Sequence, residues 1–396
     1  MRKGWEYKKL GDCFSYIKNG ANIKQKKDAD GFPITRIETL SGGVFNRDRM
    51  GYAGIHDLSK YADYVLESKD LLMSHINSKT YIGRTVEYKR NNEETIIHGM
   101  NLLRLKAIHE LIDSTFFAYY TQSGDFKSKI ARIRKDAVNQ SSFAISDLKR
   151  FDIPLPPKST QLAIVTELDK INELIRLKKE QLKDFDNLAQ SLFYEMFGDP
   201  VENEKGWEVK KLKEIGEIKT GNTPSRSNDN FYNEKFIEWI KTDNIRNEQM
   251  NPTTAAEYLS RDGAECGRIV SKGSILVACI AGSLSSIGKC CITTKNVAFN
   301  QQINAITPYG DFCNSIYLYE LIRNSYKYIQ QNATTGMKHI LSKSIFEKMK
   351  FPFPPLSLQR LFAQRIEQIE REKSEVQKSI QDLETLLASR MQCWFE

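Results

Sequence analysis

Two long stretches of the chain carry apolar residues at alternating spacings of three and four. The first stretch runs from Ile164 to Met196 and the second from Phe362 to Trp394. An apolar seam with a period of 3.5 residues that continues for several heptads is typical of a coiled-coil helix. Each stretch follows a Pro-Pro pair, after which a helix can start. We therefore predict two spacer helices of about 37 residues, each roughly 55 Å long.

The seam residues of the two predicted helices are mostly aliphatic or aromatic. They are Ile164, Leu168, Ile171, Ile175, Leu182, Phe185 and Leu192 in the first helix, and Phe362, Ile366, Ile369, Val376, Ile380, Leu383 and Leu387 in the second. Lys178 and Lys373 interrupt the seams, and the seam pattern by itself predicts no partner for either. Such a lysine either sets the register or meets an acidic group of a partner, and the pattern does not choose. The simplest pairing of the two helices is antiparallel.

Outside these stretches, short apolar and β-branched runs alternate with turn-forming residues, which predicts an α+β (mixed α/β) fold. The predicted strands are Pro33 to Leu40, Ile96 to Leu105, Glu238 to Thr242, Ser274 to Ile280 and Ile303 to Thr307. Apolar residues at helical spacing predict helices from Ser114 to Gln122 and from Asn314 to Arg323. The order of the strands does not follow from the pattern.

The second half of the chain repeats landmarks of the first half in the same order. Gly4–Leu10 (GWEYKKL) returns as Gly206–Leu212 (GWEVKKL), and Pro154–Pro157 (PLPP) returns as Pro352–Pro355 (PFPP). In the same way, Gln161 is answered by Gln359, and Ile82-Gly83-Arg84 by Ile287-Gly288-Lys289. Ordered self-similarity of this kind indicates a tandem pseudo-repeat. We predict two globular bodies, 1–153 and 201–351, each followed by a Pro-rich hinge and a spacer helix, 154–200 and 352–396.

Charge, cysteines and histidines narrow the class of protein only a little. The 58 Lys and Arg against 50 Asp and Glu give a net charge of +8, which is compatible with a polyanionic partner but does not require one. The seven cysteines form no CxxC pair, and the five histidines show no HxxxH spacing, so we expect no metal site. The sequence contains no apolar run that could span a bilayer. We expect a cytoplasmic protein without a membrane partner.

Catalytic motifs are missing from the sequence. Gly282–Lys289 looks like a phosphate loop, but five residues separate its glycines and Cys290 follows its lysine. A phosphate loop has four residues there and Ser or Thr after the lysine. Neither Pro-Pro segment has the preceding Asn or Asp and the following aromatic residue that adenine-N6 methyltransferases use. We therefore predict a binding protein with no catalytic residues.

The repeat, the two GWExKKL openings, the two Pro-x-Pro-Pro hinges and the two coiled-coil helices together resemble the specificity subunit of type I restriction-modification systems. The resemblance covers the whole chain. It implies two target recognition domains, each reading one half of a split, asymmetric site in double-stranded DNA, with the helices fixing the spacer between the half-sites.

The same resemblance implies that the chain catalyses nothing and binds no cofactor itself. Two methyltransferase subunits would dock on it and methylate adenine at N6, and ATP-driven restriction subunits can join them. S-adenosylmethionine, ATP and Mg would then belong to these partner subunits.

Two other classes of function remain as alternatives. A self-sufficient DNA methyltransferase or nuclease would need catalytic residues that the sequence does not display. A purely structural coiled-coil spacer would be indifferent to DNA, whereas a DNA reader binds with an affinity that falls steeply as salt rises.

Polar segments at corresponding places in both bodies are the candidates for DNA contact, because Arg, Lys, Asn and Gln read base edges while other polar groups hold phosphates. In the first body they are Thr35, Arg36, Thr39, Ser41, Asn77, Ser78, Lys79, Asn139 and Gln140. In the second body they are Lys241, Thr242, Asn244, Arg246, Ser283, Ser285, Ser286, Lys338 and His339. A basic run is either a phosphate grip or a solvated helix face: Lys127, Lys129, Arg132, Arg134 and Lys135.

Overall fold

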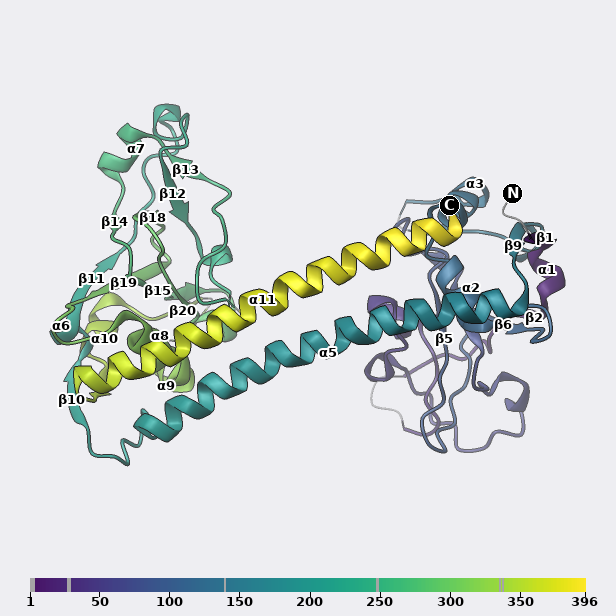
Figure 1. The fold of residues 1–396 in the computed structure, drawn as a ribbon, viewed down its shortest axis with the longest axis horizontal. Coiled ribbons are helices and arrows are strands. Elements are labelled where there is room, and N and C mark those ends of the chain that lie inside the picture. The colour runs from purple at the N-terminus through teal and green to yellow at the C-terminus, as the bar shows by residue number, and fades with distance from the viewer. Residues whose placement is uncertain (1–3, 27–29, 139, 247–248, 335, 337) are drawn as a thin grey trace. The chain divides into compact units, whose positions relative to one another are not determined.

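The computed structural model describes residues 4–26, 30–138, 140–246, 249–334, 336 and 338–396, and it divides into two compact units (Figure 1). Unit 1 consists of Met1–Lys178 together with Ser379–Glu396, and unit 2 consists of Lys179–Lys378. The division passes through the two long helices, α5 (Lys158–Phe197) and α11 (Leu356–Phe395). Each unit therefore contains one body and parts of both helices.

Unit 1 is built around a four-stranded antiparallel sheet with the order β2-β6-β3-β5. Its strands are β1 (Glu6–Lys9), β2 (Phe14–Asn19), β3 (Leu71–Ser74), β4 (Ile76–Asn77), β5 (Thr85–Glu87), β6 (Leu102–Ala107), β7 (Lys135–Asp136), β8 (Ser141–Ser142) and β9 (Asp152–Leu155). Its shorter helices are α1 (Leu10–Cys13), α2 (Ser114–Tyr120), α3 (Gly124–Ile133) and α4 (Ile145–Lys149), and its 3-10 helices are η1 (Ile37–Gly43), η2 (Arg47–Arg49) and η3 (Ala62–Tyr64).

Unit 2 has a central antiparallel sheet with the order β11-β19-β15-β17 and a second sheet with the order β13-β12-β18-β14. Its strands are β10 (Glu208–Lys211), β11 (Gly216–Thr220), β12 (Ile237–Ile240), β13 (Tyr258–Leu259), β14 (Ile269–Val270), β15 (Ile275–Ala278), β16 (Ile280–Ala281), β17 (Cys290–Ile292), β18 (Val297–Phe299), β19 (Ile303–Pro308), β20 (His339–Ile340) and β21 (Lys350–Phe353). Its shorter helices are α6 (Leu212–Ile215), α7 (Arg261–Cys266), α8 (Ser315–Asn324), α9 (Tyr326–Gln331) and α10 (Lys343–Lys348), with 3-10 helices η4 (Asp229–Phe231), η5 (Thr242–Asn244) and η6 (Leu284–Ser286).

The central sheets of the two units have the same topology. In each sheet the strands follow one another in the spatial order first, fourth, second and third along the chain. Each body then continues into a helix on which aromatic residues pack, α2 in unit 1 and α8 in unit 2. The predicted mixed α/β class and the pseudo-repeat are confirmed.

The predicted strand from Pro33 to Leu40 is wrong. Ile34 makes only isolated bridges, to Gly51 and Ile97, and the chain then enters η1. The extended run ends there because the N–H of Thr39 returns to the C=O of Arg36 at 3.1 Å. The predicted strand from Ile96 to Leu105 also starts too early, since β6 begins at Leu102. The three strands predicted in the second half correspond to β12, β15 with β16, and β19.

The two repeated motifs of each half pair with one another. Strand β1, from the GWEYKKL opening, runs antiparallel to β9, which enters the first Pro-rich hinge, with Tyr7 opposite Pro154. Strand β10 pairs with β21 in the same register, with Val209 opposite Pro352. The opening and the hinge therefore recur together because they form one two-stranded element in each unit.

A buried glutamine fastens each hinge to its body. Gln161 is fully buried, and its Nε2 donates to the C=O of Pro156 and of Leu111, both at 2.9 Å. Its Oε1 accepts from the N–H of Asp113, at the start of α2, at 2.8 Å. Gln359 repeats this arrangement in unit 2 with the C=O of Pro354 and Phe312 and the N–H of Asn314.

Both long helices contribute to the hydrophobic core of each unit. In unit 1 the core contains Ile164 and Leu168 of α5 together with Phe395 of α11. In unit 2 it contains Phe362 and Ile366 of α11 together with Phe193 and Phe197 of α5. The contacts of Phe193 and Phe197 with Phe362, and of Asp186 with Lys373, show that the helices run antiparallel within unit 2.

The predicted seam is buried along much of both helices. Ile164, Leu168, Ile171, Ile175 and Ile380 are buried in unit 1, and Phe362, Ile366, Ile369 and Val376 are buried in unit 2. The remaining seam residues are partly buried: Leu182, Phe185, Leu192, Leu383 and Leu387.

The seam prediction fails at the last turns of both helices. There the buried residues are Phe193, Phe197 and Phe395, whereas Met196 and Trp394 are only partly buried. A helix with 3.6 residues per turn drifts by about 20° per heptad relative to a 3.5-residue seam. After four heptads, this drift brings the neighbouring position into the core.

The lysine in the second seam is not unpaired, which corrects our expectation. Lys373 is 5% exposed, and its Nζ lies 3.0 Å from Asp186 of α5 and 2.8 Å from Glu370. Asp186 also binds Arg323 of α8, at 3.1 Å, and Arg323 pairs with the buried Glu320. Lys373 thus joins α11 to α5 within unit 2.

We predict that replacing either buried glutamine with leucine destabilises the protein. In Gln161→Leu and Gln359→Leu, one backbone N–H and two C=O groups lose their partner inside the protein. Stranded polar groups of this kind lower the free energy of unfolding by about 3 kcal/mol, which urea titration measures. Gln381→Leu, on an exposed position of α11, is the matched control and is expected to change it by about 0.5 kcal/mol or less. Equal effects for all three variants would contradict the structural role.

Candidate nucleic-acid interface

The first predicted polar segment has the same local structure in both units. In unit 1 the Oγ1 of Thr39 accepts from the N–H of Arg36 at 2.8 Å, and in unit 2 the Oδ1 of Asn244 accepts from the N–H of Lys241 at 3.0 Å. The N–H of Asn244 returns to the C=O of Lys241, just as that of Thr39 returns to Arg36. Residues 205 positions apart in the sequence therefore occupy equivalent turns, one in each unit.

Three of the predicted contacts in this segment hold the fold and are out of reach of a ligand. Thr35, Thr39 and Asn244 are 2%, 0% and 9% exposed. Thr35 accepts from the N–H of Gly99, and the amide of Asn244 donates to Thr253. We correct the prediction for these three residues, because their polar atoms are buried and already paired. The other residues of the segment are exposed or half-buried and remain predictions: Arg36, Ser41, Lys241, Thr242 and Arg246.

The second and third predicted segments of unit 1 meet in the small sheet β4-β8-β7. Asn77 on β4 lies opposite Ser141 on β8. Lys79 binds the carboxylate of Asp136 at 3.1 Å, and Ser141 donates to the same carboxylate at 2.6 Å. Hydrogen bonds from Ser141 and Lys79 lower the pKa of Asp136 to about 2. Ser78, Lys79 and Gln140 are exposed, Asn77 is half-buried, and Asn139 lies outside the described residues.

The corresponding segments of unit 2 meet in the pair β16-β20. Ala281 at the end of β16 lies opposite His339 on β20. Just after β16, the hydroxyl of Ser283 lies 3.2 Å from that of Ser285 and 3.0 Å from that of Ser286. Ser283, Ser285 and Lys338 are exposed, and Ser286 and His339 are half-buried.

Each unit has an open polar cleft that is lined in part by residues in or next to the first two segments. The unit 1 cleft has a volume of about 500 Å³, and its lining includes Gly42, Gly43, Lys79, Arg84, Lys127 and Arg134. The unit 2 cleft has a volume of about 450 Å³, and its lining includes Thr242, Asp243, Arg246, Ser286, Lys289 and Gln302. Cations and amides in such clefts are suited to phosphate oxygens and base edges.

The structure places three residues in these clefts that the sequence interpretation missed, namely Arg84, Lys289 and Gln302. The repeat had marked the first two, because Ile82-Gly83-Arg84 matches Ile287-Gly288-Lys289. In the sequence, the second of these segments stands out only as a failed match to a phosphate loop. No motif singled out Gln302.

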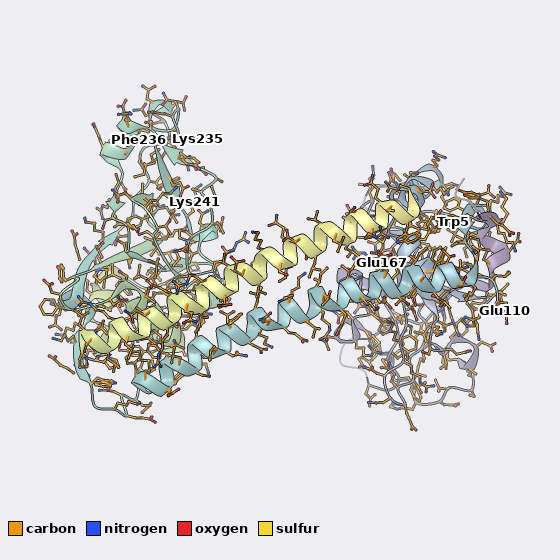
Figure 2. The ribbon with its side chains drawn as sticks, in the orientation of Figure 1. Trp5, Glu110, Glu167, Lys235, Phe236 and Lys241 are labelled. Atoms are coloured by element: carbon orange, nitrogen blue, oxygen red, sulfur yellow. The ribbon has the colours of Figure 1, made fainter. Side chains whose placement is uncertain are left out.

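Lys241 belongs to a cluster of cations and aromatic rings in unit 2. Its Nζ lies 4.9 Å from the centroid of Trp239, and Arg226 lies 4.8 Å from the same ring. Glu257 pairs with both cations. Burial alone would raise the pKa of Glu257, but hydrogen bonds from Lys241 and Arg226 outweigh this and lower it. Figure 2 shows Lys241 at one end of β12, with Lys235 and Phe236 at the other.

The basic run of unit 1 divides into two groups. Lys129 binds Asp125 at 2.6 Å and the C=O of Asp152 at 2.8 Å, and Arg134 pairs with Asp136 at 2.8 Å. The other three residues are exposed: Lys127, Arg132 and Lys135. The run is thus partly a neutralised helix face and partly an exposed group of cations.

The described residues contain no group of three or more His, Cys, Asp or Glu that could hold a metal ion. All seven cysteines are free thiols, and burial raises the pKa of Cys279 to about 12. Within the described part of the chain, no helix combines the length and the apolar character needed to cross a bilayer.

We predict that alanine at the buried turn positions lowers stability but not DNA affinity. Thr39→Ala and Asn244→Ala remove the acceptor for the backbone N–H three residues earlier, that of Arg36 or Lys241, and should lower the free energy of unfolding by about 1 to 2 kcal/mol. Ser41→Ala and Arg246→Ala, at matched positions two residues further on, are the controls and should leave stability nearly unchanged. A loss of DNA affinity in folded Thr39→Ala, measured by fluorescence anisotropy, would contradict the assignment.

Comparison with known proteins gives matches that cover most of the chain and one that covers part of it. The family of the type I restriction modification DNA specificity domain matches twice, at residues 2–184 and 204–385. One relative is a Methanocaldococcus jannaschii protein named as the putative specificity subunit of the type I restriction enzyme MjaX. It is 26% identical to this chain, and the alignment covers 97% of this chain and 92% of the relative. The HindI specificity subunit of Haemophilus influenzae is 32% identical over 166 residues, 41% of this chain and 35% of its own.

Two solved structures have the same fold. A chain from a study of complex assembly and conformational transition of the type I restriction-modification system aligns with a TM-score of 0.62 at 17% identity, covering 100% of this chain and 98% of that one. The type I S subunit of M. genitalium aligns with a TM-score of 0.56 at 15% identity, covering 98% of this chain and 95% of that one. With both halves matched by the family, the chain belongs to the type I restriction-modification DNA specificity subunits, which recognise DNA and are not catalytic.

Proposed function

We propose that each unit reads one half of a split sequence in double-stranded DNA, and that the reading side chains line the two clefts. The main support is that one scaffold recurs with different side chains on it. The turn and the small β-pairing are common to both units, whereas the side chains at matched positions differ, as in Ser41 and Arg246. Two similar frames with unlike contact surfaces are suited to two unlike half-sites.

We further propose that α5 and α11 set the gap between the half-sites. Each helix has 40 residues and is therefore about 60 Å long. Half-sites one helical turn apart, roughly 34 Å, present the same groove to one face of a bound protein. The pairing of the buried Lys373 with Asp186 supports a fixed helix register, because a shift would separate the two charges.

The proposed partners are two methyltransferase subunits, with restriction subunits as further members of the complex. S-adenosylmethionine, ATP and Mg would act on those chains. The charged residues Arg176, Lys179 and Glu180 are exposed on α5 and offer a polar surface for docking.

The decisive experiment separates DNA reading from the two alternatives. The purified chain is mixed with random-sequence duplex DNA over a range of salt concentrations, with and without S-adenosylmethionine. A reader binds with an affinity that falls steeply with salt and transfers no methyl group. Indifference to DNA at every salt concentration would favour a purely structural spacer, and methyl transfer or cleavage without added subunits would favour an enzyme.

We predict that exchanging residues 1–150 for the corresponding body of another specificity subunit changes one half-site only. The second half-site and the gap should stay the same, because unit 2 and both helices keep their sequence. Sequencing of methylated adenines in cells that carry the chain and its partners measures all three features. A change in both half-sites would show that the units do not read independently.

Removing one heptad from both α5 and α11 should shorten the gap without changing either half-site. Seven residues are two helical turns, so each helix loses about 10 Å. The matched control replaces the same heptads with another apolar-seam sequence of equal length and keeps the gap. If the shortened chain methylates sites with the original gap, the helices do not set the spacing.

A further inference from the structure

We propose that Arg84 in unit 1 and Lys289 in unit 2 are matched anchors for DNA phosphates, one in each cleft. This inference rests on the proposed reading of DNA. It adds that these two cations bind the phosphate backbone of the DNA, whereas the residues that differ between the units read the bases.

The backbone places the two cations in the same way. Arg84 follows Gly83, with φ of +80°, and Lys289 follows Gly288, with φ of +86°. A Cβ added at Gly83 would lie 3.0 Å from Ile130 of α3, and one added at Gly288 would lie 3.1 Å from Ile329 of α9. Only glycine suits a turn with this backbone and so close a helix. The next residue lines the cleft in both units.

Neither anchor has an acidic partner within the described part of the chain. The guanidinium of Arg84 donates to the C=O of Leu40 at 3.2 Å and lies 4.4 Å from the centroid of Tyr81. These two contacts orient the group but leave its charge uncompensated. The described residues also form no ion pair with Lys289.

Other cations of the same segments are neutralised. Lys79 and Arg134 share Asp136, Arg36 pairs with Glu38 at 3.4 Å, and Lys241 pairs with Glu257. The open positive charge of each cleft therefore lies on a few residues, among them one of the matched pair. A polyanion is the ligand class that such a position attracts.

The difference between the two anchors favours phosphate over a base as the contact. Arginine and lysine carry the same charge, but only arginine has a planar fork that pairs with two acceptors at once. They can therefore replace one another where charge alone is needed, as at a phosphate. Residues that read a base need a particular shape, and the neighbouring matched pair Ser41 and Arg246 differs in charge as well.

The test measures the salt dependence of binding to a fluorescein-labelled random-sequence duplex, using the full chain. Arg84→Gln and Lys289→Gln should each reduce the slope of log K against log salt by about 0.9, which is about eightfold weaker binding at ~0.1 M salt. Arg84→Lys and Lys289→Arg keep the charge and should keep the slope. Lys213→Gln removes an exposed charge on α6, outside the clefts, and should also keep it.

The outcomes separate this inference from the function on which it rests. If the unsubstituted chain shows no salt-dependent binding, the proposed function fails and the anchors fail with it. If the unsubstituted chain binds normally and both glutamine variants keep its slope, only the anchors are overturned. The Arg84→Gln variant also loses a hydrogen bond to Leu40, so its unfolding midpoint is measured. Lys289→Gln, which loses no such bond, tests the same idea if Arg84→Gln unfolds.

A second readout distinguishes anchoring from base reading. In the complex with methyltransferase subunits, the Arg84→Lys and Lys289→Arg variants should methylate the same sequence as the unsubstituted chain. A changed half-site in either conservative variant would assign base reading to that residue and contradict a phosphate anchor.

Discussion

Each body of this protein closes its hydrophobic core only with side chains from both long helices. In unit 1, Phe395 from the end of α11 packs against Phe116 and Tyr120 of α2. In unit 2, Phe193 and Phe197 from the end of α5 pack against Tyr317 of α8. Protein cores are close-packed, so these aromatic contacts fix how the helix ends lie within each unit. The helices are therefore structural parts of the bodies and cannot be separated from them as simple linkers.

The same constraint explains which parts of the sequence repeat. The opening strand, the hinge strand and the buried glutamine form one joint in each unit, and a change in one of them would strand polar groups of the others. The residues that line the clefts are not needed to stabilise the neighbouring turn, because Thr39 or Asn244 holds that turn in place. A scaffold of this kind allows the contact surface to change while the fold is kept, as a family of readers with different targets requires.

Much of the fold could be predicted from the sequence, because the signals were periodic or repeated. The helices α5 and α11 followed from their apolar seams, and the repeat followed from two short motifs. The prediction failed where local geometry departs from a simple period. Because of helical drift, Phe197 and Phe395 are buried in the cores, whereas Met196 and Trp394 are only partly buried. The turn at Arg36 ends the extended segment that the sequence pattern predicts as a strand.

The candidate site was harder to predict from the sequence than the fold, for a different reason. Thr35, Thr39 and Asn244 have the polar character of contact residues, and only the structure shows that their polar atoms are used internally. Lys373 looked unpaired until its contact with Asp186, 187 residues away in sequence, was visible. Arg84 and Lys289 were within reach of the repeat, but their shared place in the clefts depends on the contacts of Gly83 and Gly288 with helices distant in sequence.

The central claim is that one chain with two similar units reads two half-sites at a fixed separation. Sequencing of modified adenines in the genome of cells that carry this chain with its methyltransferase partners tests it most directly. The account predicts methylation at a single split motif, with two unlike half-sites and one constant gap of unspecified bases. Methylation at one continuous motif, or at half-sites with a variable gap, would contradict it.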